Sequence, residues 1–317
     1  VKLTDEGDNG EAYFSWDSKK LIWQSNRGDR GCDKIWTMNI DGSDKKMVSP
    51  DKGANTCSFF LPGDKKIVFG STSHLEGACP PKPDLKGKHY VWTLFPYDIF
   101  IADANGENPV NLTADNPEYD AEPVLGADGK KIVFGSKREK DFDIYTMDID
   151  GKNVKRLTDT YGYDGGPWFS PDGAKIVWRA WHPETEAEKA SWKDSMEFNY
   201  ITPVPLDIWI MNADGSEKKL LVKNGATNWS PSFTPDGKRI IFSSNMDDWR
   251  GEIGKYGPNF ELYIMNADGT NQKRLTYNTT FDSFPMFSPD GKKLSWCSNR
   301  NPEKPRATDV FIADWVE

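Results

Sequence analysis

This sequence has no long apolar run, no excess of basic residues and few histidines. No stretch approaches the ~20 apolar residues of a membrane-spanning helix, so we expect no membrane insertion. The 317 residues include 40 Lys and Arg against 49 Asp and Glu, a net charge of -9. That balance argues against nucleic-acid binding, because contacts to phosphates need a basic face. Three histidines and no C-x-x-C pair disfavour a structural zinc site.

Signatures of common hydrolases are missing as well. The chain contains neither G-x-S-x-G nor H-E-x-x-H, the patterns that place a serine nucleophile or a catalytic zinc. We therefore predict a protein without enzymatic activity and without a required cofactor.

Turn-forming and aromatic residues are abundant, with 27 Gly, 21 Pro, 13 Trp, 11 Tyr and 17 Phe, and they recur in a repeat. Six related segments can be read along the chain: FSWDSKKLIWQS, FLPGDKKIVFGS, LGADGKKIVFGS, FSPDGAKIVWRA, FTPDGKRIIFSS and FSPDGKKLSWCS. A second block such as DIYTMDIDGK follows each one, and its Asp-Gly or Asn-Gly pairs are typical of tight hairpins. Each unit therefore predicts four short antiparallel strands.

Six such units predict an all-β fold, a six-bladed β-propeller that forms one domain over residues 1–317. The sixth copy lacks the final Leu-Thr strand, whereas Leu3-Thr4 stands alone at the start of the sequence. We therefore expect the N-terminal strand to complete the last blade and close the ring. We expect a monomer.

The repeats FSPDGKKLSWCSNR and DIYTMDIDGKNVKRLT closely resemble those of the TolB family, the periplasmic propellers of the Tol–Pal envelope system. The resemblance covers nearly the whole chain and implies a periplasmic or secreted propeller that binds a protein or peptide of the cell envelope. The sequence departs from TolB in having its repeats begin at Val1, without the separate N-terminal domain of that family. Its cysteines and long insertions are further departures.

Three insertions, residues 71–97, 181–206 and 246–259, all fall on one face of the predicted ring, which we call the top face. This face carries the loops between the second and third strands of a blade and the loops between blades. Insertions on one face usually form a binding surface, and we take Trp92, Trp181 and Trp249 as candidate anchors. The alternative is that these aromatic loops pack against each other. Thr185 and Glu188 form a capping box that predicts a short helix in the second insertion.

A polar residue recurs at one equivalent position of every inner strand, before the turn. The six residues are Asn9, Asn55, Asp120, Asp164, Asn228 and Asp282. They could cap turns through the backbone or form a ligand or Ca²⁺ site at the channel mouth, because Ca²⁺ prefers oxygen ligands. Glu11 and Glu122 lie two residues further on and could add to such a site. Arg179 replaces a small residue nearby and could balance the acids, bind a carboxylate or be a surface Arg that faces solvent.

His74 and His182 end second strands in two blades and, with carboxylates, could hold a metal. The alternative function is therefore a carbohydrate-active or metal-dependent propeller lyase or hydrolase. In either case the ligand would bind on the top face.

Four cysteines occur, and their positions suggest a disulfide in an oxidising compartment. Cys32 and Cys57 fall at the top of adjacent blades, so we predict that they pair. Cys79 is the competing partner, and Cys297 is expected to be a buried thiol.

Overall fold

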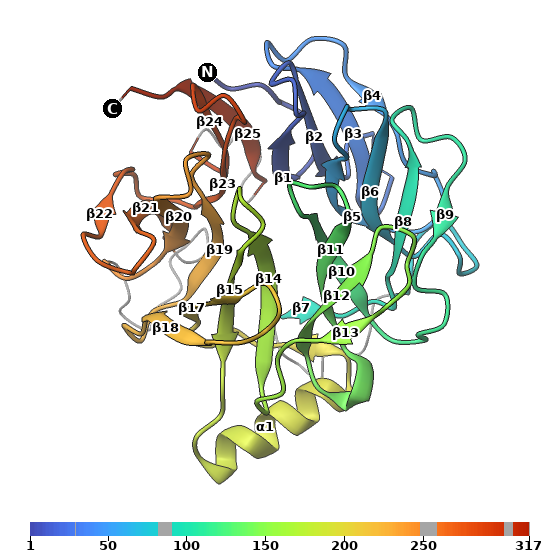
Figure 1. The fold of residues 1–317 in the computed structure, drawn as a ribbon. Coiled ribbons are helices and arrows are strands. Elements are labelled where there is room, and N and C mark those ends of the chain that lie inside the picture. The colour runs from blue at the N-terminus through green and yellow to red at the C-terminus, as the bar shows by residue number, and fades with distance from the viewer. Residues whose placement is uncertain (29, 82–90, 248–258, 301–306, 317) are drawn as a thin grey trace.

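Six antiparallel sheets follow one another around a ring in the computed structural model, which describes residues 1–28, 30–81, 91–247, 259–300 and 307–316 (Figure 1). Blade 1 comprises β1 (Asn9–Phe14), β2 (Lys20–Ser25), β3 (Lys34–Asn39) and β4 (Lys46–Met47). Blade 2 comprises β5 (Asn55–Phe60), β6 (Lys66–Ser71), β8 (Asp98–Asp103) and β9 (Val110–Asn111). Blade 3 comprises β10 (Asp120–Leu125), β11 (Lys131–Ser136), β12 (Asp143–Asp148) and β13 (Lys155–Arg156).

The second half of the ring repeats the pattern. Blade 4 comprises β14 (Tyr163–Phe169), β15 (Lys175–Trp181), β17 (Asp207–Asn212) and β18 (Lys219–Val222). Blade 5 comprises β19 (Asn228–Phe233), β20 (Arg239–Ser244), β21 (Glu261–Asn266) and β22 (Lys273–Arg274). Blade 6 comprises β23 (Asp282–Phe287), β24 (Lys293–Ser298) and β25 (Asp309–Asp314). The predicted all-β, six-bladed propeller is confirmed.

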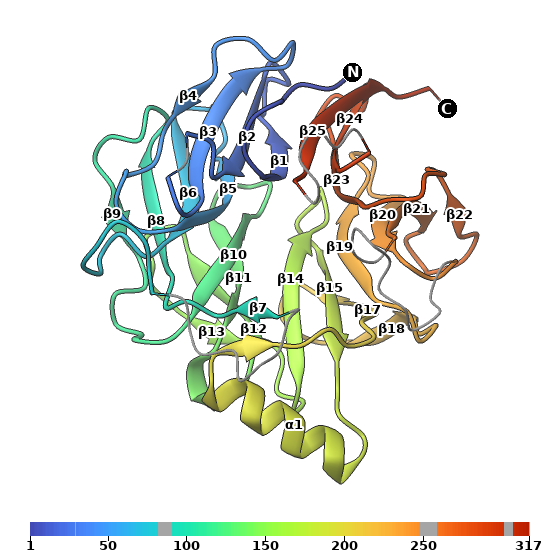
Figure 2. The same cartoon turned by 180° about the vertical axis from the view of Figure 1, so that it is seen from behind.

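The first residues of the chain complete blade 6, as predicted. Lys2 pairs antiparallel with Phe311 of β25, and the amide of Leu3 donates to the carbonyl oxygen of Val310 at 2.8 Å. Figures 1 and 2 show the two ends of the chain next to each other. The chain thus closes its own ring through hydrogen bonds.

Thr4 reproduces a contact that recurs in other blades. Its hydroxyl accepts from the amide of Val310 at 2.8 Å and donates to the Asp309 carboxylate at 3.0 Å. In blade 3, Thr158 makes the same two bonds, to Ile144 and Asp143. The Leu-Thr pair therefore contributes to strand pairing in both blade 3 and blade 6.

Apolar residues of the strands pack between neighbouring blades. The largest cluster covers blades 1 to 4 and is centred on Ile67, Phe69, Ile132, Phe134 and Trp178. Consecutive strand residues supply it, such as Ile67, Val68 and Phe69 of β6, because both faces of a sheet are covered by neighbouring blades. In the described part of the chain, no helix is long and apolar enough to cross a membrane.

Two insertions meet on the top face. The short strand β7 (Trp92–Thr93) comes from the blade 2 insertion and pairs antiparallel with β16 (Tyr200–Ile201) from the blade 4 insertion. Figures 1 and 2 show β7 between β12 of blade 3 and β14 of blade 4. These two strands link loops that are more than a hundred residues apart.

The predicted helix is present as α1 (Glu186–Glu197), beside a one-turn 3-10 helix, η1 (Arg138–Lys140), in blade 3. Thr185 is its N-cap and forms the full capping box with Glu188. Trp192 of α1 donates to the Asp141 carboxylate at 2.8 Å, which fixes the helix against blade 3 (Figure 1).

Candidate functional site

Each of the six inner strands carries a β-bulge at the same place, where the register shifts two residues beyond the recurrent Asx position. The bulged residues all have positive φ: Glu11, Cys57, Glu122, Gly166, Ser230 and Phe284. Positive φ costs a residue with a side chain about 1–2 kcal/mol, so the fold accepts strain at five of six positions. Bulges turn side chains in a new direction, and here they turn them toward the ring axis.

A cavity of about 40 Å³ lies on this axis and is lined by all six bulged residues. A buried water needs roughly 10–15 Å³ of such space, so the cavity has room for a few waters or one small group. Tyr13 and Phe59 stack with ring centroids 4.4 Å apart, and Trp168 packs edge-on against both. Because blades 1 and 4 face each other across the ring, these contacts fill the axis next to the cavity.

Arg179 is the cation of this site. It is 4% exposed, and its Nη2 donates to a Glu122 carboxylate oxygen at 2.5 Å. The guanidinium carbon lies 4.0 Å from the ring centroid of Trp229 and 5.2 Å from that of Trp92, distances typical of cation–π contacts. Of the roles that the sequence left open for Arg179, this ion pair corresponds to balancing a nearby acid.

The space for Arg179 depends on a glycine. A Cβ atom on Gly166 would stand 1.7 Å from Arg179 Nη1, and Gly166 has φ +57°. The Gly166 amide also donates to the other Glu122 oxygen at 2.8 Å. Glu122 is therefore held from two sides.

Glu11 is the second acid at the axis, and its carboxyl lies in the cavity wall. Burial raises its pKa to about 7, and the charge of Glu122 adds to the effect, although a hydrogen bond with Cys57 opposes it. Burial also raises the pKa of the Cys57 thiol. Near neutral pH, Glu11 can therefore gain or lose a proton beside a neutral thiol.

The six recurrent Asx residues are fully or nearly fully buried. Their side chains bond to their own blade or to the neighbouring one, as Asn9 does to the Thr308 carbonyl oxygen and Asn228 to that of Leu206, and none of them lines the axial cavity. Asn9 accepts from Trp23 Nε1 at 3.0 Å, and Asn55 donates to backbone carbonyl oxygens. These are the contacts expected of turn-capping residues.

The Asp members differ from the Asn members by having a cation. Arg138 donates to Asp120, and Arg300 donates to Asp282. His182 lies 3.2 Å from Asp164. Burial lowers the pKa of His182, but the Asp164 carboxylate outweighs burial, so the pKa of His182 is raised. Burial raises the pKa of Asp120, opposed by Arg138. Each carboxylate thus has its own partner in the loop after the second strand.

The two predicted metal-binding histidines are not brought together. His74 pairs with Asp98 at 3.3 Å in blade 2, and His182 pairs with Asp164 in blade 4. Among the described residues, no group of three or more His, Cys, Asp or Glu side chains is arranged to hold a metal ion. Nothing in the site geometry supports the predicted Ca²⁺.

The candidate tryptophan anchors are engaged in packing. Trp92 lies 4.7 Å from Trp229, and Trp181 lies 6.0 Å from Trp192 of α1, measured between ring centroids. Both are half-buried next to a cluster that includes Leu94, Tyr163 and Trp192. Trp249 lies outside the described residues. The insertions of blades 2 and 4 thus share a core of their own.

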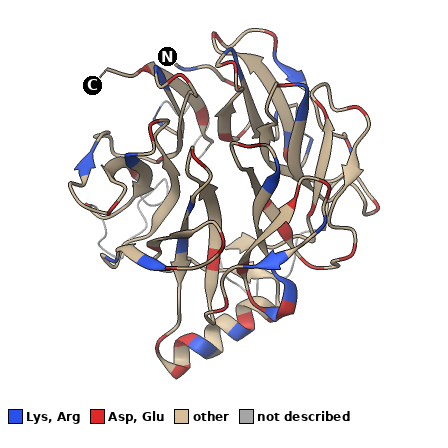
Figure 3. Ribbon diagram, in the orientation of Figure 1, with Lys and Arg blue, Asp and Glu red and all other residues tan. Residues whose placement is uncertain are grey.

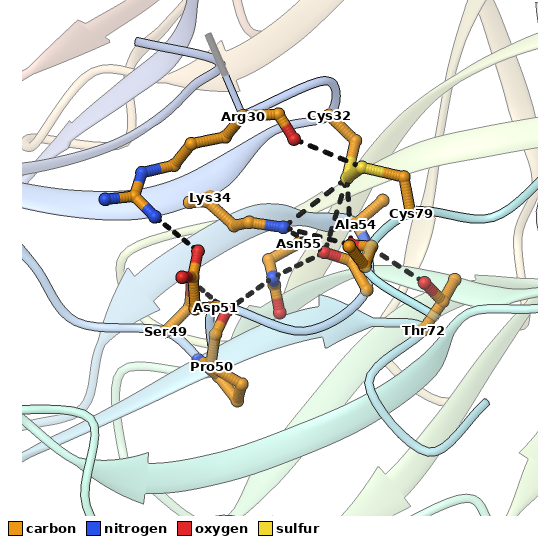
Figure 4. The surroundings of a disulfide bond; sticks show 12 residues. Arg30, Cys32, Lys34, Ser49, Pro50, Asp51, Ala54, Asn55, Thr72 and Cys79 are labelled. Carbon is orange, nitrogen blue, oxygen red and sulfur yellow. Dashed lines mark hydrogen bonds and ion pairs between the residues drawn. A yellow bond between two sulfur atoms is a disulfide. The ribbon is translucent and has the colours of Figure 1, made fainter. Parts of the chain in front are cut away.

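The predicted Cys32–Cys57 disulfide is wrong. Cys32 bonds to Cys79, with the Cα atoms 5.9 Å apart, and Cys57 is a buried free thiol (Figure 4). The bulge of β5 turns Cys57 to the axial cavity, whereas the blade 2 insertion brings Cys79 back over blade 1. Cys297 is a buried thiol, as predicted.

Sequence reasoning missed several residues of the site. Cys57, Ser230 and Phe284 share the repeat position of Glu11 and Glu122, so the repeat alignment could have pointed to them. Tyr163 and Trp229 were not singled out; the buried hydroxyl of Tyr163 has no hydrogen-bond partner among the described residues.

The fold and this axial site define a six-bladed propeller with a buried acid–base cluster. No family model matches the chain. It is 28% identical over 232 residues to the Tol-Pal system protein TolB of Francisella tularensis, covering 64% of this chain and 51% of that protein. An uncharacterized protein of Agrobacterium fabrum is 26% identical over 208 residues, 62% of this chain and 60% of that protein. The chain thus spans 60% or less of the length of these relatives.

Solved structures agree with the fold. A structure named for TolB, from Agrobacterium tumefaciens, matches with a TM-score of 0.62 at 21% identity, covering 99% of this chain and 92% of that one. An oligogalacturonate lyase in complex with manganese matches with a TM-score of 0.58 at 12% identity, covering 100% and 93%. At such identities the structures show the fold alone. The chain is thus similar in sequence to part of TolB and similar in fold to solved TolB propellers.

Proposed function

We propose that this chain is a protein-binding propeller of the bacterial cell envelope that engages a partner segment on its top face without covalent chemistry. One observation carries the proposal: the insertions of blades 2 and 4 meet through β7 and β16 on the same face, above the axial acid–base cluster. The likeness to TolB supplies the class of partner and a periplasmic location.

Charge favours a partner segment with a basic group. Glu11 and Glu122 line the axial cavity together with the cation Arg179, and Asp33 lies near enough to raise the pKa of Glu11 further. Both signs occur around the rest of the ring (Figure 3), so this acidic excess is a local feature. A mouth walled by low-dielectric protein concentrates the potential of such acids.

The proposal can be tested without disturbing the fold. A photo-crosslinking residue placed at exposed Glu118 or Tyr161 reports on the top face, and one at exposed Asp172 reports on the opposite face. With a bacterial envelope extract, we expect specific protein adducts from the two top positions and none from Asp172. Equal labelling from both faces would contradict a top-face site.

A parallel activity assay tests the alternative function, a lyase or hydrolase. Turnover of oligogalacturonides or peptides, lost on chelation, would replace the binding proposal.

A further inference from the structure

A buried lysine lies against the Cys32–Cys79 disulfide. Lys34 is 1% exposed, and its Nζ lies 3.4 Å from Cys32 Sγ. Nζ also donates to the carbonyl oxygens of Gly53 and Ala78 (Figure 4). All three neighbours are acceptors, as an ammonium group with three donors requires.

This ammonium has no carboxylate partner. In the described part of the chain no ion pair joins Lys34 to an acid, and the nearby Asp51 pairs instead with Arg30. Burial accordingly lowers the pKa of Lys34, a change that Arg30 reinforces and that Asp51 and Asp33 oppose. An unpaired buried charge is costly, and among the described groups that Lys34 Nζ contacts directly, the sulfur of Cys32 is the one that thiol exchange can turn into an anion.

We propose that the Cys32–Cys79 disulfide is a thiol-exchange site at which an incoming aliphatic thiolate attacks Cys79 and Cys32 leaves as a thiolate beside Lys34. The attacking sulfur forms a new bond to Cys79 Sγ, and the electron pair of the broken S–S bond goes to Cys32 Sγ. Lys34 keeps its proton, so the product is an ammonium–thiolate pair. One sulfur–sulfur bond replaces another, with no net oxidation or reduction.

The surroundings of the two sulfurs give the reaction its direction. Carbonyl oxygens lie beside both sulfurs, that of Arg30 at 3.3 Å from Cys79 Sγ and those of Gly53 and Ala78 at 3.5 Å from Cys32 Sγ, but among the described residues only Cys32 also has an ammonium group beside its sulfur. Exposed Gly31 stands next to Cys79, and a side chain at that position would begin 3.4 Å from its sulfur. The absence of that side chain leaves Cys79 uncovered on this side. A thiol with a lowered pKa leaves faster in exchange, and a neighbouring lysine lowers the pKa of a thiol.

Exchange would change the top face. The disulfide ties the loop between β2 and β3 of blade 1 to the blade 2 insertion, which continues to β7 and Trp92 over Arg179. Breaking it frees one attachment of that insertion while leaving a mixed disulfide on Cys79. This site is separate from the proposed partner-binding function and can fail or hold independently of it.

The first experiment treats the folded full-length chain with reduced glutathione, quenches with acid, alkylates free thiols and maps them by mass spectrometry. We expect glutathione on Cys79 and the alkyl label on Cys32. In Lys34→Met the exchange rate should fall by about tenfold, because Cys32 loses its neighbouring cation. Lys46→Met is the matched control, since exposed Lys46 pairs with Asp44 away from the disulfide, and its rate should not change. Glutathione found on Cys32 instead, or an unchanged rate in a folded Lys34→Met, would overturn the proposal.

A second experiment keeps Lys34 in place. Cys79→Ser leaves Cys32 as a free thiol beside Lys34, and Cys32→Ser leaves Cys79 free. The pH dependence of iodoacetamide alkylation should give Cys32 a pKa at least about one unit below the usual ~8.5 and lower than that of Cys79. A Cys32 pKa at or above the usual value would refute the thiol-exchange proposal. Repeating the exchange with a cysteine-bearing peptide distinguishes protein thiols from small thiols as the source.

Discussion

Replacing Leu3 by alanine tests how firmly the first strand closes the ring. Leu3 is 7% exposed and packs in a cluster with Leu21, Trp23, Val310 and Ile312. Removing a buried leucine side chain costs about 2–5 kcal/mol. The loss of stability on Leu3→Ala cannot exceed the free energy needed to detach residues 1–4 from β25. If the strand is held less strongly than that, it leaves the sheet, and no cavity remains in the core.

Leu157 is the matched control, with the same repeat position in blade 3 and 5% exposure. Unlike Leu3, it lies within a continuous blade and cannot detach on its own. If the first strand is firmly docked, both alanine variants should lose about 3 kcal/mol. For a chain of this length the corresponding fall in Tm is about 4 °C.

Urea unfolding and thermal scans measure both variants, and amide exchange at Val310 and Ile312 reports on the first strand directly. These two amides donate to Thr4 Oγ1 and to the Val1 carbonyl oxygen. Deleting residues 1–5 should lower Tm further, because it also exposes a sheet edge. A loss below about 1 kcal/mol for Leu3→Ala beside a full loss for Leu157→Ala would refute firm closure.

Three further outcomes test the blades and the axis. Because the pKa of Glu11 is raised to about 7 in the folded protein, its contribution to stability is present below its unfolded value near 4.5 and is lost as pH rises through 7. Glu11→Gln should therefore remove that decline and stabilise the protein by roughly 2–3 kcal/mol at pH 8, measured by urea unfolding; an unchanged pH profile would contradict it. Asn228→Asp should destabilise blade 5 by about 2 kcal/mol or more, since it buries a carboxylate without a cation. Adding Met246→Arg, at the repeat position of Arg138 and Arg300, should restore much of the lost stability. Gly166→Ala should lower Tm by several degrees by displacing Arg179, whereas the same change at Gly173, which has open space around it, should cost only the strain of its positive φ.

The repeat made most of the fold predictable. Blade number, strand order and closure by Leu3 and Thr4 all follow from one recurring pattern, because each copy repeats the same local turns and pairings. The choice between Asp and Asn was readable only in part. The blades with Asp120 and Asp282 carry Arg two residues after the second strand, but blade 1 combines Asn9 with Arg27 at that position, and Arg27 pairs with Glu6 instead. That correlation was not drawn from the sequence.

The axial site was predictable only in part. Glu11, Glu122 and Arg179 were named as candidates, but the bulges that aim them at the axis have no local signature, because Glu and Cys rarely adopt positive φ. The same bulge explains the wrong disulfide. Adjacent blades do bring Cys57 near blade 1, yet the backbone turns its sulfur inward.

Closure by the first residues has a consequence for how the protein is made. During synthesis, Leu3 and Thr4 emerge before the strands of blade 1, but their partner strand β25 emerges only after five blades have been translated. Sheets of blades 1 to 5 can form from segments close in sequence, whereas blade 6 requires contacts separated by about three hundred residues. Pairing between segments so far apart in sequence forms slowly, so we expect blade 6 to be completed after the other blades. Until it does, an open edge of β25 stays available to chaperones or to a neighbouring nascent chain.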